Sequence, residues 1–459
     1  MEITFILLSS LVLSSVEAVQ LGQQQIHLSL SPADDSGPSS LPDWIVRHAG
    51  PIAPFHQIGS YEPPPTSCKV VQVNQLQRHG SRYPTAKVNK RIQRAIRKLQ
   101  QASHLHESIS FLTKYQYRLG EDSLLPLGAS ESFNAGVQLA SRYPHLVDPQ
   151  HLPFIRASSS QRVVHSAHNF SSGFAAHIGI PLHSIKPIVI SEDHHSNNTL
   201  DNNSCPNRKS NRKKKQWLKT FGAKITDRLN SLAVNAGLDN KDTLALMQLC
   251  IFESLAEAKL SNFCQLFDHA DWSDYSYYYD LDKYYNHGQG NPLGQAEGLG
   301  YVAELFTRLT GDTKWVEQDQ SKVNQTLDRS WVTFPLDRSS YVDFSHDNQM
   351  ISILAALGLP ATQTLPETGP PSSPKSWDVS KWMPFGSRLT VEKMACGPRQ
   401  NEFVRFILND MVLNITSCKS GHDYRAFNED PTICQLSHFL ESRTGLLEQS
   451  KNLHEQCSI

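Results

Sequence analysis

A strand that leads through a polar loop into a helix occurs twice in this 459-residue chain, and this pattern limits its possible folds most strongly. Residues 70–76 are mostly β-branched or apolar, and an amphipathic helix follows the polar residues 77–80. Residues 341–344 form a second candidate strand, which leads through residues 345–348 into an apolar helix. In open α/β sheets, ligands bind at the carboxyl ends of strands, where helix amino termini point. We therefore expect an α/β fold in which the two loops meet at one site.

The bulk composition argues against nucleic-acid or membrane partners. The chain has 43 Lys and Arg residues against 44 Asp and Glu residues, which gives a formal net charge of −1. Anion recognition must therefore come from a local cluster of positive charge. The basic run within residues 206–216 contains no aromatic residue, so we interpret it as a solvated loop and not as a nucleic-acid site.

The amino-terminal segment is typical of a signal peptide. An apolar run from Ile3 to Val16 ends at small residues that are typical of a signal-peptide cleavage site. The alternative is an uncleaved membrane anchor, but the run is shorter than the ~20 residues that a membrane-spanning helix needs. We expect a signal peptide at residues 1–18, followed by an irregular arm at 19–66 that is rich in Ser, Pro and Gly.

Cysteines and glycosylation sequons also indicate export. The chain has eight cysteines and no C-x-x-C pair, which favours disulfides over zinc or redox chemistry. It has five N-x-S/T sequons, at Asn169, Asn197, Asn202, Asn324 and Asn414. We therefore expect a secreted, N-glycosylated protein.

The loop after the first strand has the composition of a phosphate site, with the sequence Arg78-His79-Gly80-Ser81-Arg82-Tyr83-Pro84. Two guanidinium groups four residues apart can enter one cavity and donate forked, charge-assisted bonds to phosphoryl oxygens. Their charge lowers the pKa of the histidine between them and keeps its imidazole neutral, as a nucleophile requires. Gly80 lets the backbone approach a substrate closely. R-H-G alone could be a surface turn, but the complete string is far more specific.

The string resembles the signature of the histidine acid phosphatases, and its surroundings resemble the fungal phytase branch of that family. Further matching segments lie at 154–158, 283–285, 290–294 and 343–348. The resemblance implies a mixed β-sheet flanked by helices, the histidine phosphatase and phosphoglycerate mutase-like α/β fold. It places the catalytic region at residues 67–459, with a smaller α-helical domain inserted at about 100–145 and 205–290.

The resemblance also implies a role for each matching position. His79 would be the nucleophile, and Asp347 would be the general acid that protonates the leaving alkoxide and then activates water. Asn348 would orient the acid or the substrate, and Lys283 would lie at the rim of the substrate pocket. The phosphoryl group would be held by Arg78, Arg82, Arg156 and His346.

Four disulfides are implied by the same resemblance: Cys68–Cys396, Cys205–Cys457, Cys250–Cys264 and Cys418–Cys434. The family often has a fifth bridge in its amino-terminal arm. This chain has no cysteine there, so we expect a less fixed arm.

The activity implied by the resemblance is that of a phytase. Such an enzyme acts on a small-molecule phosphate ester, myo-inositol hexakisphosphate (phytate), through a phosphohistidine intermediate. We expect a monomer without a metal or other cofactor. Phytases line the pocket rim with lysines, and Lys87, Lys90 and Arg91 could add to Lys283. Asp282, however, stands where related phytases can carry Lys, which leaves a broad-specificity acid phosphatase as the alternative.

Two further alternatives are a metal hydrolase and a non-catalytic phosphate-binding protein. The string Asp193-His194-His195 resembles a metal-ligand cluster, but H-E-x-x-H is absent from the sequence. A non-catalytic protein would have no need to keep both His79 and Asp347. We therefore favour the hydrolase that uses a histidine nucleophile.

Overall fold

The computed structural model describes residues 40–193, 196, 198–201, 204–208, 212–321, 323–360, 362–371, 376–415, 418 and 430–458. The signal peptide expected at 1–18, the first part of the arm, His194, His195 and the sequons at Asn197 and Asn202 lie outside the described residues. No helix of the described part is long and apolar enough to cross a membrane.

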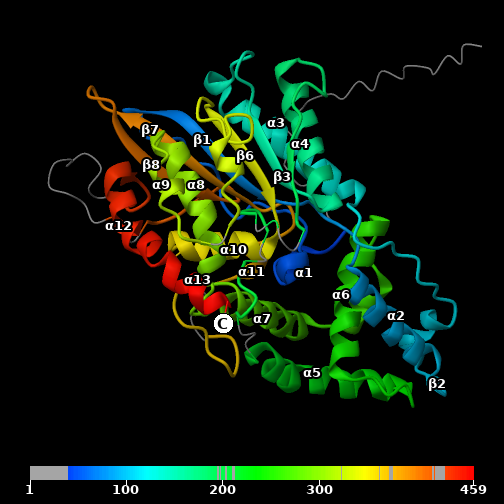
Figure 1. Ribbon diagram of the computed structural model, residues 1–459. Helices are drawn as coiled ribbons and strands as arrows, with labels where there is room; N and C mark the ends of the chain where they lie inside the picture. Colours follow the sequence, from blue (N-terminus) through cyan, green and yellow to red (C-terminus); the bar gives the residue numbers. More distant parts are fainter. Residues whose placement is uncertain are drawn as a thin grey trace, which may run out of the picture. The chain divides into compact units, whose positions relative to one another are not determined.

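In the described part of the chain, one mixed sheet of eight strands forms the centre of the fold (Figure 1). Its strand order is β10 (Cys434–Gln435), β8 (Asn401–Leu408), β7 (Arg388–Cys396), β1 (Cys68–Arg78), β6 (Ser340–Ser345), β3 (Phe154–Ser158) and β4 (Ile188–Ile190), and β9 (Met411–Val412) pairs with β8. A separate two-stranded sheet joins β2 (His104–Leu105) to β5 (Ala233–Val234).

The parallel half of the sheet brings the two reactive loops together. Strands β1, β6, β3 and β4 are parallel, whereas β7 and β8 run antiparallel to their neighbours. The last residue of β1, Arg78, lies opposite the last residue of β6, Ser345. The loops that begin at His79 and His346 therefore leave the same edge of the sheet side by side, which confirms the prediction made from their strand-loop-helix pattern.

Helices cover both faces of the sheet, as the predicted α/β class requires. On one face lie α3 (Pro126–Arg142) and α4 (Gln161–Ile178), and Phe170 of α4 packs edge-on against Phe344 of β6 with 5.5 Å between ring centroids. On the other face lie α8 (Leu299–Thr310) and α12 (Leu436–Glu448). The ring centroid of Phe439 on α12 lies 5.0 Å from that of Phe406 on β8. These aromatic contacts bury the two apolar faces of the sheet.

A group of four helices packs together beside the sheet: α2 (Ala86–Gln100), α5 (Lys213–Leu232), α6 (Asn240–Glu257) and α7 (His269–Asn286). Helix α6 is apolar on nearly every side because α2 and α5 both pack against it. The helical insertion expected at about 100–145 and 205–290 therefore needs correction in its first segment. Helix α3 packs against α4 on the sheet, and α2 takes its place among the inserted helices.

The described part of the arm is well packed without a disulfide. It forms α1 (Asp43–Val46) and the short 3-10 turn Gly50–Ile52, and Ile45, Ile52 and Ala53 are buried. The ring centroid of Trp44 lies 3.9 Å from that of His269 at the start of α7. The expectation of a less fixed arm is therefore wrong for residues 40–55, because apolar burial replaces the missing bridge.

The remaining helices are α9 (Lys314–Glu317), α10 (Asp347–Leu357), α11 (Val379–Trp382) and α13 (Ser450–Ser458). The four predicted disulfides are confirmed: Cys68–Cys396, Cys205–Cys457, Cys250–Cys264 and Cys418–Cys434. The first ties β1, immediately upstream of His79, to the end of β7.

Candidate active site

His79 lies at the carboxyl end of β1 and is 2% exposed. Its Nδ1 is 2.9 Å from the carbonyl oxygen of Gly80, to which it donates a hydrogen bond, and its backbone N–H donates to the carbonyl of Ser345 at 3.2 Å. A proton on Nδ1 leaves the lone pair on Nε2. The loop thus fixes the tautomer in which Nε2 can act as a nucleophile.

The surroundings of His79 keep its imidazole neutral. Burial lowers the pKa of His79 well below its usual value, and the positive charges of Arg78, Arg82 and Arg162 lower it further. A histidine at the surface would be mostly protonated at acid pH. The depressed pKa therefore makes this imidazole available as a nucleophile under acidic conditions.

Backbone contacts from two other helices hold the loop that carries His79. The N–H of Gly80 donates to Oγ of Ser166 on α4 at 3.0 Å, and the N–H of Ser81 donates to the carboxylate of Glu131 on α3 at 2.7 Å. A Cβ on Gly80 would lie 2.2 Å from the carbonyl oxygen of Gly128. The glycine is required because α3 packs directly against the loop.

Three guanidinium groups surround the His79 ring: Arg78, Arg82 and Arg162. Each has a buried Nε with no hydrogen-bond partner in the structure. Burial and mutual repulsion lower the pKa of Arg82 to about 9, and burial also lowers the pKa of Arg78. Buried donors that lack partners, in a cluster of like charge, indicate a site built for an anion.

Neighbouring groups fix the direction of two of these arginines. Arg78 donates through its Nη1 to the carbonyls of Pro51 and Met383, the latter at 2.8 Å. Pro51 belongs to the arm, so the arm helps to orient the site. Arg82 donates to the carbonyl of Tyr83 at 2.7 Å, and both guanidinium groups lie over the ring of Phe385.

Arg162 is the site residue that the sequence reasoning missed. It lies in the first turn of α4, directly after the loop that follows β3, and its Nη2 is 3.5 Å from Nδ1 of His346. The signal was present in the sequence, since a strand at 154–158 leads through a polar turn into a helix whose second residue is Arg162.

The structure places Arg156 elsewhere, which corrects its assignment to the phosphate site. Arg156 is 1% exposed, and its guanidinium donates to Asp343 of β6 at 2.7 Å and to Glu304 of α8 at 2.5 Å. Arg308 of α8 also pairs with Asp343, at 2.6 Å. Because Arg156 and Asp343 are register partners on neighbouring strands, their side chains share the face covered by α8. Arg156 therefore holds the sheet to α8.

Replacing the two arginines separately will distinguish these positions. Arg162→Ala is expected to lower kcat/KM by about 10² to 10³ because it removes one anion donor, with little change in Tm. Arg156→Met is expected to cost about 3–5 kcal/mol of stability because it leaves the buried Glu304 carboxylate without its ion-pair partner, while the folded fraction keeps its turnover. Thermal unfolding and steady-state kinetics on the two variants measure both effects. Loss of turnover in Arg156→Met at unchanged Tm would reverse the assignment.

His346 lies beside His79, with 5.7 Å between ring centroids. Its Nε2 donates to the carboxylate of Glu192 at 2.8 Å. Burial raises the pKa of Glu192, but the hydrogen bond and charge of His346 outweigh that effect and lower it to about 2. Nδ1 of His346 faces Arg162.

Among the described residues, one group could bring three metal-ligand atoms together: Glu192, Asp201 and His346, whose ligand atoms lie within 4.8 Å of one another. The guanidinium of Arg162 adjoins this group at His346 and would repel a cation. We therefore assign no role to a metal in the proposed chemistry.

Asp347 is the first residue of α10, where the helix amino terminus favours a negative charge. Its carboxylate lies 2.6 Å from Nζ of Lys283 and 3.6 Å from Nη2 of Arg78. Burial would raise the pKa of Asp347, but Lys283 and Arg78 hold it well below the usual range. Without a ligand, this residue is a carboxylate.

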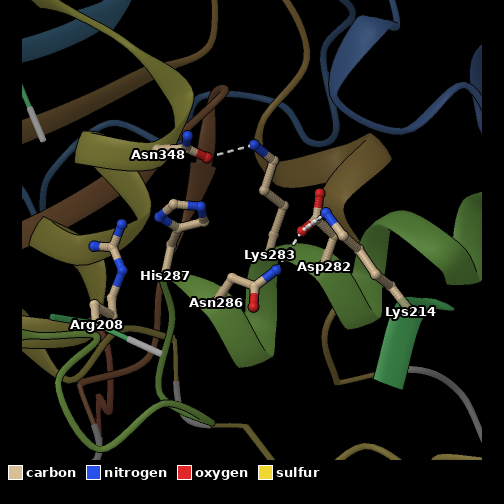
Figure 2. Close-up of a pocket in the computed structure, with 7 residues that line it drawn as sticks. All are labelled: Arg208, Lys214, Asp282, Lys283, Asn286, His287 and Asn348. Atoms are coloured by element: carbon tan, nitrogen blue, oxygen red, sulfur yellow. Dashed lines mark hydrogen bonds and ion pairs between the residues drawn. The ribbon is translucent and has the colours of Figure 1, made fainter. Parts of the chain in front are cut away.

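Lys283 and Asn348 are also part of the arrangement around Asp347. Nζ of Lys283 donates both to Asp347 and to Oδ1 of Asn348, the latter at 2.5 Å. Lys283 therefore contacts the Asp347 carboxylate and also lines the adjoining cavity (Figure 2). The other cations expected at the rim, Lys87, Lys90 and Arg91, lie exposed on α2 and are not among the residues that line this cavity.

Comparison with known proteins agrees with this geometry. The sequence profile of the histidine phosphatase superfamily (branch 2) matches residues 69–409. The chain belongs to this family. It is 37% identical to Phytase A of Aspergillus awamori over 397 residues, which is 80% of this chain and 83% of that protein. It is 36% identical to Phytase A of Aspergillus fumigatus, over 77% of this chain and 79% of that protein.

Solved structures confirm the fold of this histidine acid phosphatase. The crystal structure of the phytase from D. castellii matches with a TM-score of 0.72 at 22% identity, over 90% of this chain and 87% of that chain. The Bifidobacterium longum multiple inositol polyphosphate phosphatase, in complex with inositol hexasulfate, matches with a TM-score of 0.58 at 14% identity, over 85% and 96% of the two chains. The protein is thus a phytase-like histidine acid phosphatase with the family's mixed α/β fold.

Proposed function

We propose that the chain is a secreted acid phosphomonoesterase that hydrolyses phytate to lower inositol phosphates and phosphate through a phosphohistidine at His79. The observation that carries this proposal is the position of the His79 ring, neutral and buried among Arg78, Arg82 and Arg162. A phosphoryl group in that cluster would receive donors from the guanidinium groups, whose charge also stabilises the transition state.

In the first step, the lone pair on Nε2 of His79 attacks phosphorus, and the ester P–O bond breaks. The bond electrons go to the leaving alkoxide, which takes a proton from Asp347. An inositol or sugar alkoxide is a poor leaving group, so this protonation is essential. Arg78, Arg82, Arg162 and His346 hold the phosphoryl oxygens.

The proton on Asp347 must arrive with the substrate, because the free carboxylate is ionised. A phosphate monoester has a second pKa near ~6, so it carries one proton in acid. The bound phosphoryl group also offsets the positive charges of Arg78 and Lys283, which raises the affinity of Asp347 for that proton.

In the second step, Asp347 accepts a proton from water as the water oxygen attacks phosphorus. The P–N bond breaks, its electrons return to Nε2 of His79, and inorganic phosphate leaves with the proton held by Asp347, which becomes a carboxylate again. The resting tautomer is restored because Nδ1 keeps its hydrogen bond to Gly80 throughout.

Export and glycosylation are part of the same proposal. Four disulfides suit an oxidising compartment. Of the described sequons, Asn324 and Asn414 are exposed and Asn169 is half-buried on α4. We propose that the mature protein is a glycosylated extracellular monomer.

Broad specificity toward simple monoesters is the second candidate, and the engagement of Lys283 with Asp347 favours it, since that cation is partly neutralised. The test is kcat/KM on phytate against kcat/KM on p-nitrophenyl phosphate and glycerol phosphate at acid pH. We expect the value for phytate to exceed that for glycerol phosphate by at least about tenfold, because additional phosphates meet additional cations. A value no higher for phytate would assign the enzyme to the broad class.

A further inference from the structure

The two ring nitrogens of His346 have very different surroundings. Nε2 lies 2.8 Å from Oε1 of Glu192, which is within the range of a charge-assisted hydrogen bond. Nδ1 lies 3.5 Å from Nη2 of Arg162, which is at the outer limit for any hydrogen bond. The protein therefore holds the ring firmly at one nitrogen and directs the other nitrogen toward the guanidinium cluster.

Glu192 can only accept a hydrogen bond from His346. Burial raises the pKa of Glu192, but its partners lower it to about 2, so the group is a carboxylate in mild acid. The proton of this hydrogen bond therefore belongs to Nε2. Donation to a phosphoryl oxygen needs a second proton, on Nδ1, and a doubly protonated ring donates from both nitrogens. The negative charge of Glu192 favours that form of the ring.

The carboxylate of Glu192 is itself fixed in place. Glu192 follows β4, which is parallel to β3, so it lies at the sheet edge from which the reactive loops leave. Its backbone N–H donates to Oγ of Ser159 at 2.9 Å, and its Oε1 also accepts from the backbone N–H of Ser160 at 3.0 Å. Ser160 is the N-cap of α4, and a helix amino terminus favours a negative charge. Little side-chain entropy is therefore lost when His346 meets a ligand.

The amino terminus of α4 thus places two groups of opposite charge, Glu192 and Arg162, at the His346 ring. A phosphoryl oxygen next to Nδ1 would accept from His346 and from Arg162 together. The ring of His79 lies nearby, with 5.7 Å between centroids. A carboxylate oxygen of Asp201 lies within 4.8 Å of the bonded atoms of Glu192 and His346. The ring is therefore next to the proposed nucleophile and has negative charge on its other side.

We infer that Glu192 is a positioning residue of the reaction, which holds the His346 ring so that Nδ1 donates a proton to the phosphoryl group beside Arg162. This inference rests on the proposed function, because it assumes phosphoryl transfer to His79. Glu192 acts through His346 and does not itself contact the substrate. No sequence string indicated Glu192, since β4, the strand before it, is only three residues long.

The first test is Glu192→Gln, with Asp193→Asn as the matched control. Glutamine keeps the size of the side chain and an Oε1 that can accept both hydrogen bonds, so this change removes mainly the charge. We expect kcat/KM to fall about tenfold on p-nitrophenyl phosphate and on glycerol phosphate alike, at unchanged Tm, because both substrates place the same phosphoryl group at Nδ1. Asp193 is the next residue and is exposed, so Asp193→Asn should stay within about twofold of the parent.

Inhibition by sulfate at several pH values distinguishes this role from a purely structural one. Sulfate resembles phosphate but keeps its charge as the pH rises, so the pH dependence of its Ki reports only groups of the protein. We expect sulfate to lose affinity at a pH lower by roughly 1 in Glu192→Gln, because the doubly protonated ring is less favoured without the carboxylate. The other titratable groups near the ring are the same in both proteins: His79, Arg162, Asp201 and Asp347. An equal change in Ki at every pH would overturn the inference.

A double variant with His346→Asn shows whether Glu192 acts through the ring. In the His346→Asn background, Glu192→Gln should change kcat/KM on p-nitrophenyl phosphate by less than about twofold, because the group that it positions is absent. A further tenfold loss in that background would overturn the inference. Failure of the parent enzyme on both substrates would contradict the proposed function itself. An active parent whose kcat/KM and sulfate Ki are unchanged in Glu192→Gln would contradict the positioning role alone.

Discussion

His79→Ala is expected to abolish turnover, with kcat on every phosphomonoester reduced at least about 10⁴-fold, because the nucleophile and its lone pair are removed together. The guanidinium groups of Arg78, Arg82 and Arg162 remain in this variant. It should therefore still bind inorganic phosphate, with a Kd within about tenfold of the parent value. Stopped assays with p-nitrophenyl phosphate and calorimetric titration with phosphate measure the two quantities.

The pH profile of the parent enzyme adds a second measurement to this prediction. The pKa of His79 is held well below its usual value, so the folded site keeps a neutral imidazole as the pH falls below ~6.5. Protonation of His79 should therefore not limit kcat/KM near pH ~6.5. A fall in kcat/KM as the pH drops through ~6.5, the pKa of free histidine, would contradict the burial and charge argument.

Asp347→Asn is the second change with a large expected effect, and its size should depend on the leaving group. With phytate or glycerol phosphate, whose alkoxides need a proton, we expect kcat to fall by about 10³. With p-nitrophenyl phosphate, whose phenolate leaves without one, the first step should lose far less, and hydrolysis of the phosphoenzyme should become limiting. A burst of p-nitrophenol in rapid-quench experiments measures this shift.

The matched control for Asp347→Asn is Asn348→Ala. It removes the other acceptor of the Lys283 ammonium group and leaves the carboxylate in place. We expect a smaller loss in this variant, similar for all leaving groups. An equal loss on p-nitrophenyl phosphate and glycerol phosphate in Asp347→Asn would contradict its role as the acid and would indicate a positioning role for the charge.

The local parts of the site could be predicted from the sequence because they lie within one short string or one strand-to-helix turn. His79 and Arg82 share a loop, and Asp347 begins the helix that follows β6. That the two loops meet follows from the common edge at which parallel strands end. The disulfide pairings needed the family resemblance, since spacing alone leaves many alternatives open.

The assignment of Arg156 shows what a sequence string cannot reveal. Its side chain points toward α8 because β3 and β6 pair with Arg156 opposite Asp343, and that register depends on contacts between distant parts of the chain. Arg162, only six residues later, enters the site because α4 begins there. A one-residue change in the strand register would exchange the two faces, so motif membership alone could not decide between the arginines.

Ion pairs between residues distant in sequence explain the other differences between the sequence-based predictions and the structure. The basic run 206–216 reads as solvated in the sequence, yet Asp282 and Glu297 bring Lys214 and Arg208 to a cavity. Lys283 reads as a rim cation, yet its ammonium group contacts Asp347. Each partner lies more than 60 residues away in sequence, and such pairings are set by tertiary packing.

Trapping the phosphoenzyme tests the role of His79 directly, because it identifies the residue that carries the phosphoryl group. The enzyme is quenched in alkali after brief reaction with ³²P-labelled substrate, and the label is located by peptide mapping. Asp347→Asn with a phenyl phosphate is the best form for trapping, because its phosphoenzyme should accumulate. We expect one labelled residue, His79, with label that is stable in base and lost in acid, and no label in the His79→Ala protein. Label on a serine, a carboxylate or another histidine, or turnover without any label on residue 79, would contradict the phosphohistidine mechanism.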